Sequence, residues 1–188
     1  MNNNTTYRDG YAIRNQNAPH FLTFTVCGWI DLFTRKVYKD ILIDSFKYCR
    51  SNKGLNLNAF VIMSNHIHLM ASAKDGFALS DIVRDFKAHT HRQMIKVIAS
   101  EKESRRHWML HQLKYYASRH NRNETFQIWI QNSHPEEIVS AEMGFVKLNN
   151  IHENPVRAGI VFYPQEYLYS SAKNYADGFG IMDVDFIL

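Results

Sequence analysis

Two histidines separated by a single residue are the first part of this sequence that could carry out chemistry. His66 and His68 flank Ile67 in the string MSNHIHLM. Alternate residues of a β-strand share one face, so both imidazoles would project from the same side of a sheet, about 7 Å apart at their Cα atoms. Two imidazoles placed in this way can share one divalent metal ion. A purely structural role is the alternative, because the chain holds 10 histidines and such a spacing arises easily by chance.

A second pair with the same spacing provides an internal control. His89 and His91 flank Thr90 in a segment with helical periodicity. Residues two apart on a helix point in directions about 200° apart, so these two imidazoles do not converge on one ion. We expect them to face solvent or phosphate, and we assign the candidate metal site to His66 and His68 alone.

The elements that must position the first pair can be read from hydrophobic periodicity. Alternation from His20 through HFLTFTVCGW predicts a strand, and residues 55–73 predict two strands separated at Ser64-Asn65. Residues 36–52 have a helical apolar stripe, and a second helix is predicted with Ser80 as its cap. The order of strand, helix, two adjacent strands and two helices favours an α+β fold with an antiparallel sheet.

A last long helix is predicted before the C-terminal residues. Asn132 or Ser133 is expected to cap it, Pro135 suits its first turn, and Glu136-Glu137 complement the helix N-terminus. Pro155 is expected to end it, because proline disfavours helical geometry in the residue before it.

Composition and length indicate one domain and exclude several classes of protein. The chain has 188 residues, 45% of them hydrophobic, so it can bury a core and is neither disordered nor collagen-like. We expect a polar arm at residues 1–18, a domain at 19–176 and a tail at 177–188. Cys27 and Cys49 are interpreted as reduced core thiols. Without a signal peptide or an apolar run long enough for a membrane span, the protein is predicted to be cytoplasmic, with no membrane partner.

Positive charge is concentrated more strongly than the total suggests. The formal net charge is only +4, yet residues 104–123 contain five Arg or Lys and no acidic residue, interleaved with Trp108, Tyr115 and Tyr116. Such a mixture suits contacts to phosphates together with stacking of unpaired bases, although an amphipathic helix with aromatic core residues is the alternative. The candidate DNA-binding residues are Arg84, Lys87, Arg92, Arg105, Arg106, Lys114, Arg119 and Arg122.

Several longer blocks resemble one known family. The string NHIH resembles the His-hydrophobic-His (HUH) motif of single-strand nucleases and transposases. NNIHENPVRAGIV followed by PQEYLYSSA resembles the C-terminal motif of the REP-associated tyrosine transposases, which are relatives of the insertion-sequence 200/605 transposases. TFTVCGWIDLFTR and FQIWIQNSHPEEI resemble further blocks of this family, in the same order. The resemblance covers roughly residues 20–175.

This resemblance implies a fold, a cofactor and a reaction. The fold would be a ferredoxin-like antiparallel sheet with helices packed on it. His66 and His68 would hold Mg²⁺ or Mn²⁺, with Asn154 as a further ligand. In the family a helical tyrosine attacks a DNA phosphodiester, which leaves a 5′-phosphotyrosine link and a free 3′-hydroxyl. The implied partner is single-stranded or hairpin DNA, and both monomers and homodimers occur among such enzymes.

The chain departs from the family at the nucleophile. Asn150 stands where the family has its tyrosine, and a carboxamide is not a competent nucleophile. Three explanations are open: natural loss of cleavage, engineered inactivation, or a nucleophile from elsewhere. We favour an engineered replacement, because the metal ligands and the flanking motif are intact. The candidates for a substitute nucleophile are Tyr115, Tyr116, Tyr163, Tyr167 and Tyr169.

The sequence therefore predicts a metal-dependent DNA transposase or endonuclease that is inactive in cleavage as it stands. One alternative is a DNA-hairpin-binding regulator that keeps the fold without nuclease activity. Another is a metallohydrolase that uses His66 and His68 with water as the nucleophile.

Overall fold

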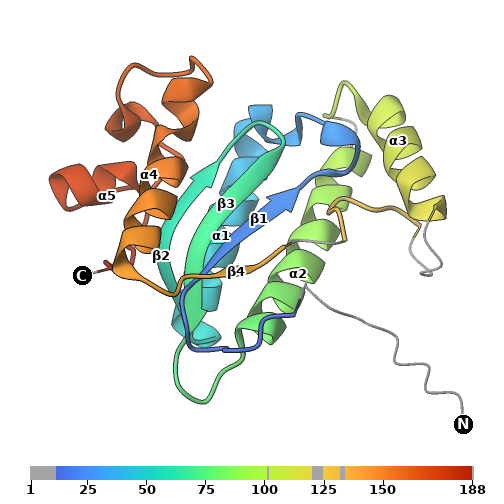
Figure 1. Ribbon diagram of the computed structural model, residues 1–188. Coiled ribbons are helices and arrows are strands. Elements are labelled where there is room, and N and C mark those ends of the chain that lie inside the picture. The colour runs from blue at the N-terminus through green and yellow to red at the C-terminus, as the bar shows by residue number, and fades with distance from the viewer. Residues whose placement is uncertain (1–11, 101, 120–124, 132–133, 188) are drawn as a thin grey trace, which may run out of the picture.

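A four-stranded antiparallel sheet forms the centre of the computed structural model, which describes residues 12–100, 102–119, 125–131 and 134–187 (Figure 1). The strands lie in the order β2-β3-β1-β4. This order, with two helices on one face, confirms the expected ferredoxin-like α+β fold. The strands are β1 (His20–Thr25), β2 (Leu55–Ile62), β3 (His66–Ala73) and β4 (Glu136–Glu137).

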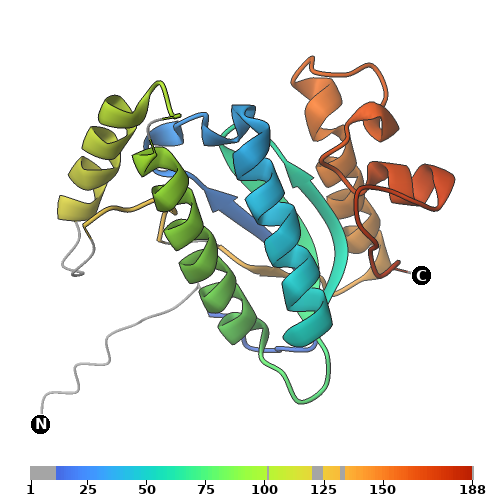
Figure 2. The ribbon, with the colours of Figure 1, turned by 180° about the vertical axis from the view of Figure 1, so that it is seen from behind.

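The two faces of the sheet carry separate apolar clusters. Because side chains alternate along a strand, Leu22, Phe24 and Ile67 belong to the larger cluster. That face is covered by α1 (Lys36–Asn52) and α2 (Leu79–Ala99), which lie in front of the sheet in Figure 2. The opposite face carries Phe21, Val61 and Met70, which pack against α4 (Ala141–Arg157). The sheet therefore separates α4 from α1 and α2.

A buried carboxylate anchors the segment that leads from α2 into α3 (Arg106–Ser118). Glu103 is 3% exposed and accepts a hydrogen bond of 2.7 Å from the hydroxyl of Tyr38, which is fully buried on α1. It also accepts from the backbone N–H of Arg105 and pairs with Arg35. Burial by itself raises the Glu103 pKa, but these hydrogen bonds outweigh it and hold the pKa below its usual value.

The free edge of β2 is covered by the C-terminal residues. After η3 (Pro164–Glu166), the backbone of residues 169–171 hydrogen-bonds to Phe60 and Ile62 before α5 (Ala172–Asp177) begins. Further on, Asp185 accepts from the backbone N–H of Leu57 and pairs with Arg50 at 2.9 Å. Asp185, which lies in the segment predicted as a tail, thus attaches that segment to β2 and α1.

Most of the elements expected before residue 100 are confirmed, but one cap is wrong. The helix at 36–52 and the two strands on either side of Ser64-Asn65 lie where they were predicted. Ser80, however, lies inside α2, whose N-cap is Ala78. The side chain of Gln16 accepts from the backbone N–H of Ser80 at 2.9 Å, so a residue of the N-terminal arm satisfies this helix end.

The predicted limits of the last helix are wrong at both ends. Glu136-Glu137 form β4, which pairs with His20 and Phe21 of β1. The helix begins later, at Ala141, where Ser140 is the cap and accepts from the backbone N–H of Met143. Pro155 lies within α4, which ends two residues later. The predicted caps Asn132 and Ser133 lie outside the described residues.

Two short 3₁₀ turns, η1 (Cys27–Trp29) and η2 (Leu32–Thr34), connect β1 to α1. Both are fastened to the turn between β2 and β3, because Val26 donates to the carbonyl of Asn65 and Phe33 to that of Ser64. None of the described helices is long and apolar enough to cross a membrane.

Candidate functional site

His66 and His68 project from β3 on the face of the sheet that carries α4. Their ring centroids lie 4.8 Å apart, at an interplanar angle of 70°. Strand register places Thr25 opposite His66 and Thr23 opposite His68 on β1. The pair therefore has the shared orientation that the His-Ile-His spacing predicts. The control pair, His89 and His91, lies on α2 across the sheet.

A hydrogen-bond network fixes the tautomer of His66. The Asn65 side-chain nitrogen donates to the carbonyl oxygen of Trp29 at 3.4 Å, which turns its amide oxygen toward His66. That oxygen lies 2.7 Å from Nδ1 of His66. Because an amide oxygen only accepts, Nδ1 carries the proton, and Nε2 of the neutral ring keeps its lone pair. Burial lowers the pKa of His66, which favours this neutral form.

His68 is held in a similar way by β1. Its Nδ1 lies 2.8 Å from the hydroxyl of Thr23, which can accept the ring proton. The ring stacks on Phe21 with centroids 5.2 Å apart. Burial, with smaller contributions from His66, Arg157 and Lys147, lowers the pKa of His68 to about 4. Both imidazoles are therefore neutral near pH 7 and able to act as metal ligands.

One face of α4 lies beside the histidine pair. Four polar residues of α4 follow one another at intervals of three, four and three residues, so their side chains share one face of the helix. This face is adjacent to the stripe of Leu148 and Ile151 that packs on the sheet. Lys147 lies 4.6 Å from the ring centroid of Phe21, on which His68 stacks. The four residues are Lys147, Asn150, Asn154 and Arg157.

Asn150 is bound within its own helix. Arg157 donates to both the side-chain and the backbone oxygen of Asn150. The Arg157 guanidinium thus links two positions of the polar face that lie about two helical turns apart. An amide that accepts from a guanidinium provides no nucleophile.

The chemistry of the donor set fits a divalent metal. Each histidine has its Nδ1 engaged with a neighbouring oxygen, the arrangement that metal-binding imidazoles usually have. No group of three His, Cys, Asp or Glu within the described ranges could hold an ion, so a third protein ligand would need another residue type. The amide oxygen of Asn154, which stands one turn beyond Asn150 on the polar face of α4, is such a donor.

Two of the tyrosines considered as substitute nucleophiles have their hydroxyls engaged elsewhere. Tyr167 donates to the carbonyl of Ile62 at 2.7 Å, and burial raises its pKa to about 12. Tyr169 donates to Asp40 of α1, on the other side of the molecule from α4. Tyr115 and Tyr116 lie on α3 with their rings in contact, and Tyr163 stands exposed before η3.

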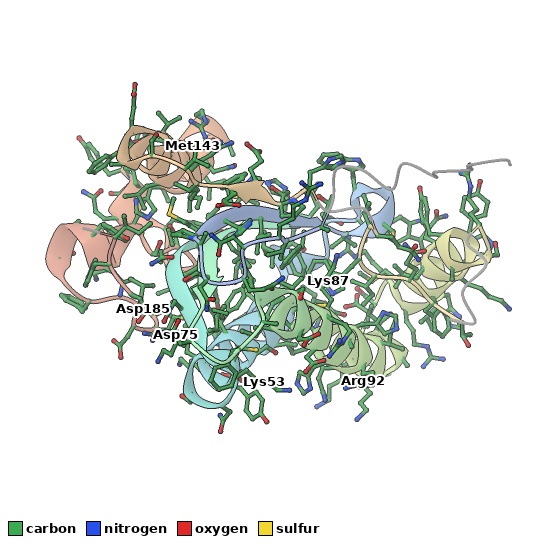
Figure 3. The ribbon with its side chains drawn as sticks, turned by 60° about the horizontal axis from the view of Figure 1, so that its bottom comes forward. Lys53, Asp75, Lys87, Arg92, Met143 and Asp185 are labelled. Carbon is green, nitrogen blue, oxygen red and sulfur yellow. The ribbon has the colours of Figure 1, made fainter. Side chains whose placement is uncertain are left out.

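The structure does not bring the α2 candidates for DNA binding together with the histidine pair. Figure 3 shows Lys87 and Arg92 on the opposite side of the sheet from Met143 of α4. Arg84 is already paired with Asp81 and Asp85 on its own helix. With residues 127–131, this face of α2 borders a separate groove.

The candidates on and beside α3 lie in an element that packs against η1, whose Trp29 contacts His66. Tyr116 approaches Gly28 so closely that a Cβ there would be 2.6 Å from its ring, which places α3 against η1. Arg105 pairs with Asp31 at 2.6 Å and lies over Trp108, while Arg119 lies over Tyr115. Arg106 reaches the carbonyl of Ala99, and Lys114 is exposed. Arg122 lies outside the described residues.

Lys87 is half-buried, and this predicts a gain in stability when its charge is removed. Its ammonium lies 4.9 Å from the ring centroid of Phe24 and donates to the carbonyl of Ile130, and burial lowers its pKa to about 8. Because the charged form is disfavoured in the folded state, Lys87→Met is expected to raise the free energy of unfolding by about 1–2 kcal/mol at pH 7. Urea denaturation measures this.

The gain should shrink as the pH rises from 8 to the ordinary lysine pKa of about 10.4, since the unfolded chain then also loses its proton. Arg92→Met is the control on the same helix, and we expect it to change stability by less than about 0.5 kcal/mol. A clear loss of stability in Lys87→Met would contradict the desolvation argument.

Lys147, Thr23 and Trp29 contribute to the site but were not predicted from the sequence. The helical spacing from Lys147 to Asn150, Asn154 and Arg157 could have revealed the lysine. Thr23 depends on strand register and Trp29 on a turn, neither of which leaves a pattern in the sequence. His152 points away from this face, and its Nε2 lies 2.9 Å from the hydroxyl of Ser171.

Fold and site together define an α+β protein with a histidine pair on an inner strand and a polar helix face beside it. A model of the family described as "Transposase IS200 like" matches residues 22–132. This match spans more than half of the chain, so the protein belongs to the IS200-like transposase family. No curated protein matches it.

One solved structure shows a similar fold, and a second is a weaker match. The structure of a REP-associated tyrosine transposase bound to a REP hairpin matches with a TM-score of 0.62 and 15% identity, over 97% of this chain and 98% of that one. A putative transposase from Deinococcus radiodurans R1 has a TM-score of 0.45 and 16% identity, over 78% of this chain and 94% of that one.

Proposed function

We propose that this transposase-family protein binds single-stranded or hairpin DNA across the face that carries His66 and His68, holds a divalent metal ion there, and does not cleave because of Asn150. The observation that carries the proposal is the juxtaposition of two oriented, neutral imidazoles with the polar face of α4. DNA as the ligand is supported by the family and by the hairpin in the structure of similar fold.

His66 and His68 would hold the metal through their Nε2 atoms, with the amide oxygen of Asn154 as the third protein ligand. A bound divalent ion in such a site acts as a Lewis acid on a phosphate oxygen. Of the two expected metals, Mn²⁺ accepts imidazole nitrogen more readily than Mg²⁺, which strongly prefers oxygen ligands and water. We therefore expect the site to bind Mn²⁺ more tightly.

The protein itself would place a phosphate beside the histidines. The Lys147 ammonium lies over the Phe21 ring on which His68 stacks, Arg157 belongs to the same polar face of α4, and both cations lower the pKa of His68. A phosphodiester between α4 and β3 would meet these two cations and the neutral imidazoles. Lys147 pairs with Glu136 at 2.6 Å, which holds its ammonium at the edge of the site.

A second candidate function is a DNA-hairpin-binding regulator with no cleavage role. The contact from Arg157 to Asn150 favours it, because the arginine uses the carboxamide as an acceptor in a well-formed site. The homodimer that the resemblance allows stays a prediction.

Metal and DNA binding test the proposed function together. In a Mn²⁺ titration, His66→Ala and His68→Ala are expected to weaken binding more than about 100-fold, since each removes a direct ligand. Thr23→Val removes only the partner of the His68 ring and should weaken it by about 10- to 100-fold. Calorimetry measures the affinities. The native protein should also bind hairpin DNA with an affinity that falls steeply with salt concentration.

His89→Ala, a surface histidine on α2, is the matched control and should leave Mn²⁺ affinity unchanged. Equal Mn²⁺ affinity in native protein and His68→Ala would overturn the metal site. Absence of DNA binding at low salt would overturn the DNA-binding function.

A further inference from the structure

An exposed tryptophan stands at the border of the histidine pair. Trp29 is 66% exposed, and its ring lies edge-on to that of His66, with the two ring centroids 6.5 Å apart. A large aromatic ring so exposed gains little from burial. Packing within the chain therefore does not explain its presence.

The backbone of Trp29 is strained. Its φ is 55°, and in the described part of the chain it is the only residue other than glycine with a positive φ. Bulky side chains rarely adopt this conformation, and such strain tends to be kept at functional sites. Together with Gly28, whose φ is 65°, Trp29 turns the chain abruptly at the end of η1.

The turn is fixed on several sides, so the backbone from which the indole projects is held in place. Trp29 donates to the carbonyl of Val26 at 3.1 Å, and Val26 donates to that of Asn65 at 2.9 Å. The Asn65 side chain joins the Trp29 carbonyl to His66. Behind the turn, Tyr116 of α3 leaves no room for a side chain at position 28. One asparagine side chain thus links the backbone of Trp29 to the ring of His66.

We propose that Trp29 is a stacking platform for one unpaired base of the DNA, next to the phosphate that lies at His66 and His68. This inference rests on the proposed function and adds to it a residue that strengthens binding of unpaired DNA without selecting a base. Base and phosphate of one nucleotide are only a few bonds apart, so a strand that reaches the histidines brings a base within reach of this ring. Aromatic stacking accepts any base and needs no hydrogen bonds.

The test uses a fluorescein-labelled DNA hairpin with a single-stranded thymidine flank, and fluorescence anisotropy reports the affinity of the full chain. Trp29→Ala is expected to weaken binding by about 5- to 100-fold, the usual loss for one stacked base. Trp29→Phe keeps an aromatic face and should retain most of the affinity. Tyr48→Ala, which removes an exposed aromatic residue from α1 on the opposite face, should change nothing.

An abasic site moved along the flank identifies the stacked base. At one position it should weaken binding to the native protein but not to Trp29→Ala, because the two changes remove the same contact. Equal losses in both proteins at every position would overturn the inference.

Trp29→Gly separates binding from folding. Glycine accepts a positive φ without strain, so this variant should unfold at the same temperature as the native protein or higher, yet bind the hairpin as poorly as Trp29→Ala. If both variants bind like the native protein, Trp29 is no platform, although DNA binding stands. If Trp29→Gly unfolds at a much lower temperature, the ring has a structural role instead. If the native protein binds no DNA, the proposed function and this inference fail together.

Discussion

The Asn150→Tyr variant is expected to become covalently joined to single-stranded DNA that the native protein only binds. The new hydroxyl would stand on the polar face of α4, one turn before Asn154 and beside His68. Its oxygen would form a bond to phosphorus as the bond to the 3′ oxygen breaks, and the phenol proton would pass, directly or through water, to the leaving oxygen. The products are a 5′-phosphotyrosine link and a free 3′-hydroxyl.

The expected effect is large because the chain with Asn150 lacks this nucleophile. Enzymes commonly accelerate such reactions at least about 10⁶-fold over the uncatalysed rate, and without a nucleophile none of that enhancement is available through this route. The substitution also removes the amide oxygen that accepts from Arg157, so the guanidinium keeps only the backbone oxygen of residue 150 as an acceptor there. A denaturing gel with labelled DNA and Mn²⁺ detects the adduct.

Asn150→Phe is the matched control, since it adds the ring without the hydroxyl, and it should form no adduct. Adding His68→Ala to Asn150→Tyr should abolish the reaction. If Asn150→Tyr binds DNA and Mn²⁺ but never forms the adduct, position 150 is not that of the nucleophile. An adduct formed by the native chain would point instead to another tyrosine.

Glu103→Ala is expected to destabilise the protein strongly, because Glu103 anchors the segment between α2 and α3. Removing the carboxylate leaves the fully buried hydroxyl of Tyr38 without its acceptor and releases Arg35 and the backbone of Arg105. An unsatisfied buried hydroxyl costs about 1–3 kcal/mol, and hydrogen bonds to a charged group are worth about as much again. We expect the free energy of unfolding to fall by about 2–4 kcal/mol.

Urea denaturation at pH 7 measures this loss. Because the Glu103 pKa is lowered in the folded protein, its contribution is complete above the ordinary carboxyl pKa of about 4.3 and is lost as the pH falls below it. The difference between native protein and Glu103→Ala should therefore narrow in acid. Asp75→Ala, at an exposed loop position, should stay within about 0.5 kcal/mol of native at pH 7. A comparably small change in Glu103→Ala would contradict the anchoring role.

The sheet and the histidine pair could be predicted because their patterns are local. The apolar run before Ser64-Asn65 and the alternation after His20 specify the strands without reference to the rest of the chain. The limits of α4 could not be predicted in this way. Glu136-Glu137 after a proline resemble a helix start, but they pair with the free edge of β1, a contact that depends on the folded sheet. Ser140 then caps the helix.

The placement of charge is the other part that the sequence does not reveal. Arg84, Lys87 and Arg92 look like one basic helix face, yet the crossing from β3 to α2 carries them to the side of the sheet opposite His66 and His68. Lys147 shares the helical spacing of Asn150, Asn154 and Arg157, but only the packing of α4 on the sheet shows that this helix face lies beside the histidines. Periodicity indicates which residues share a face of an element, whereas packing decides which face of the sheet that element covers.

Because α4 packs on the sheet of its own chain, any reaction at this site should be first order in protein concentration. His66, His68 and position 150 belong to one polypeptide, and Leu148 and Ile151 hold the helix against β2 and β3. Turnover per molecule of an active variant should therefore not depend on protein concentration. Defects in the histidines and at position 150, when carried by separate chains, should not complement each other on mixing.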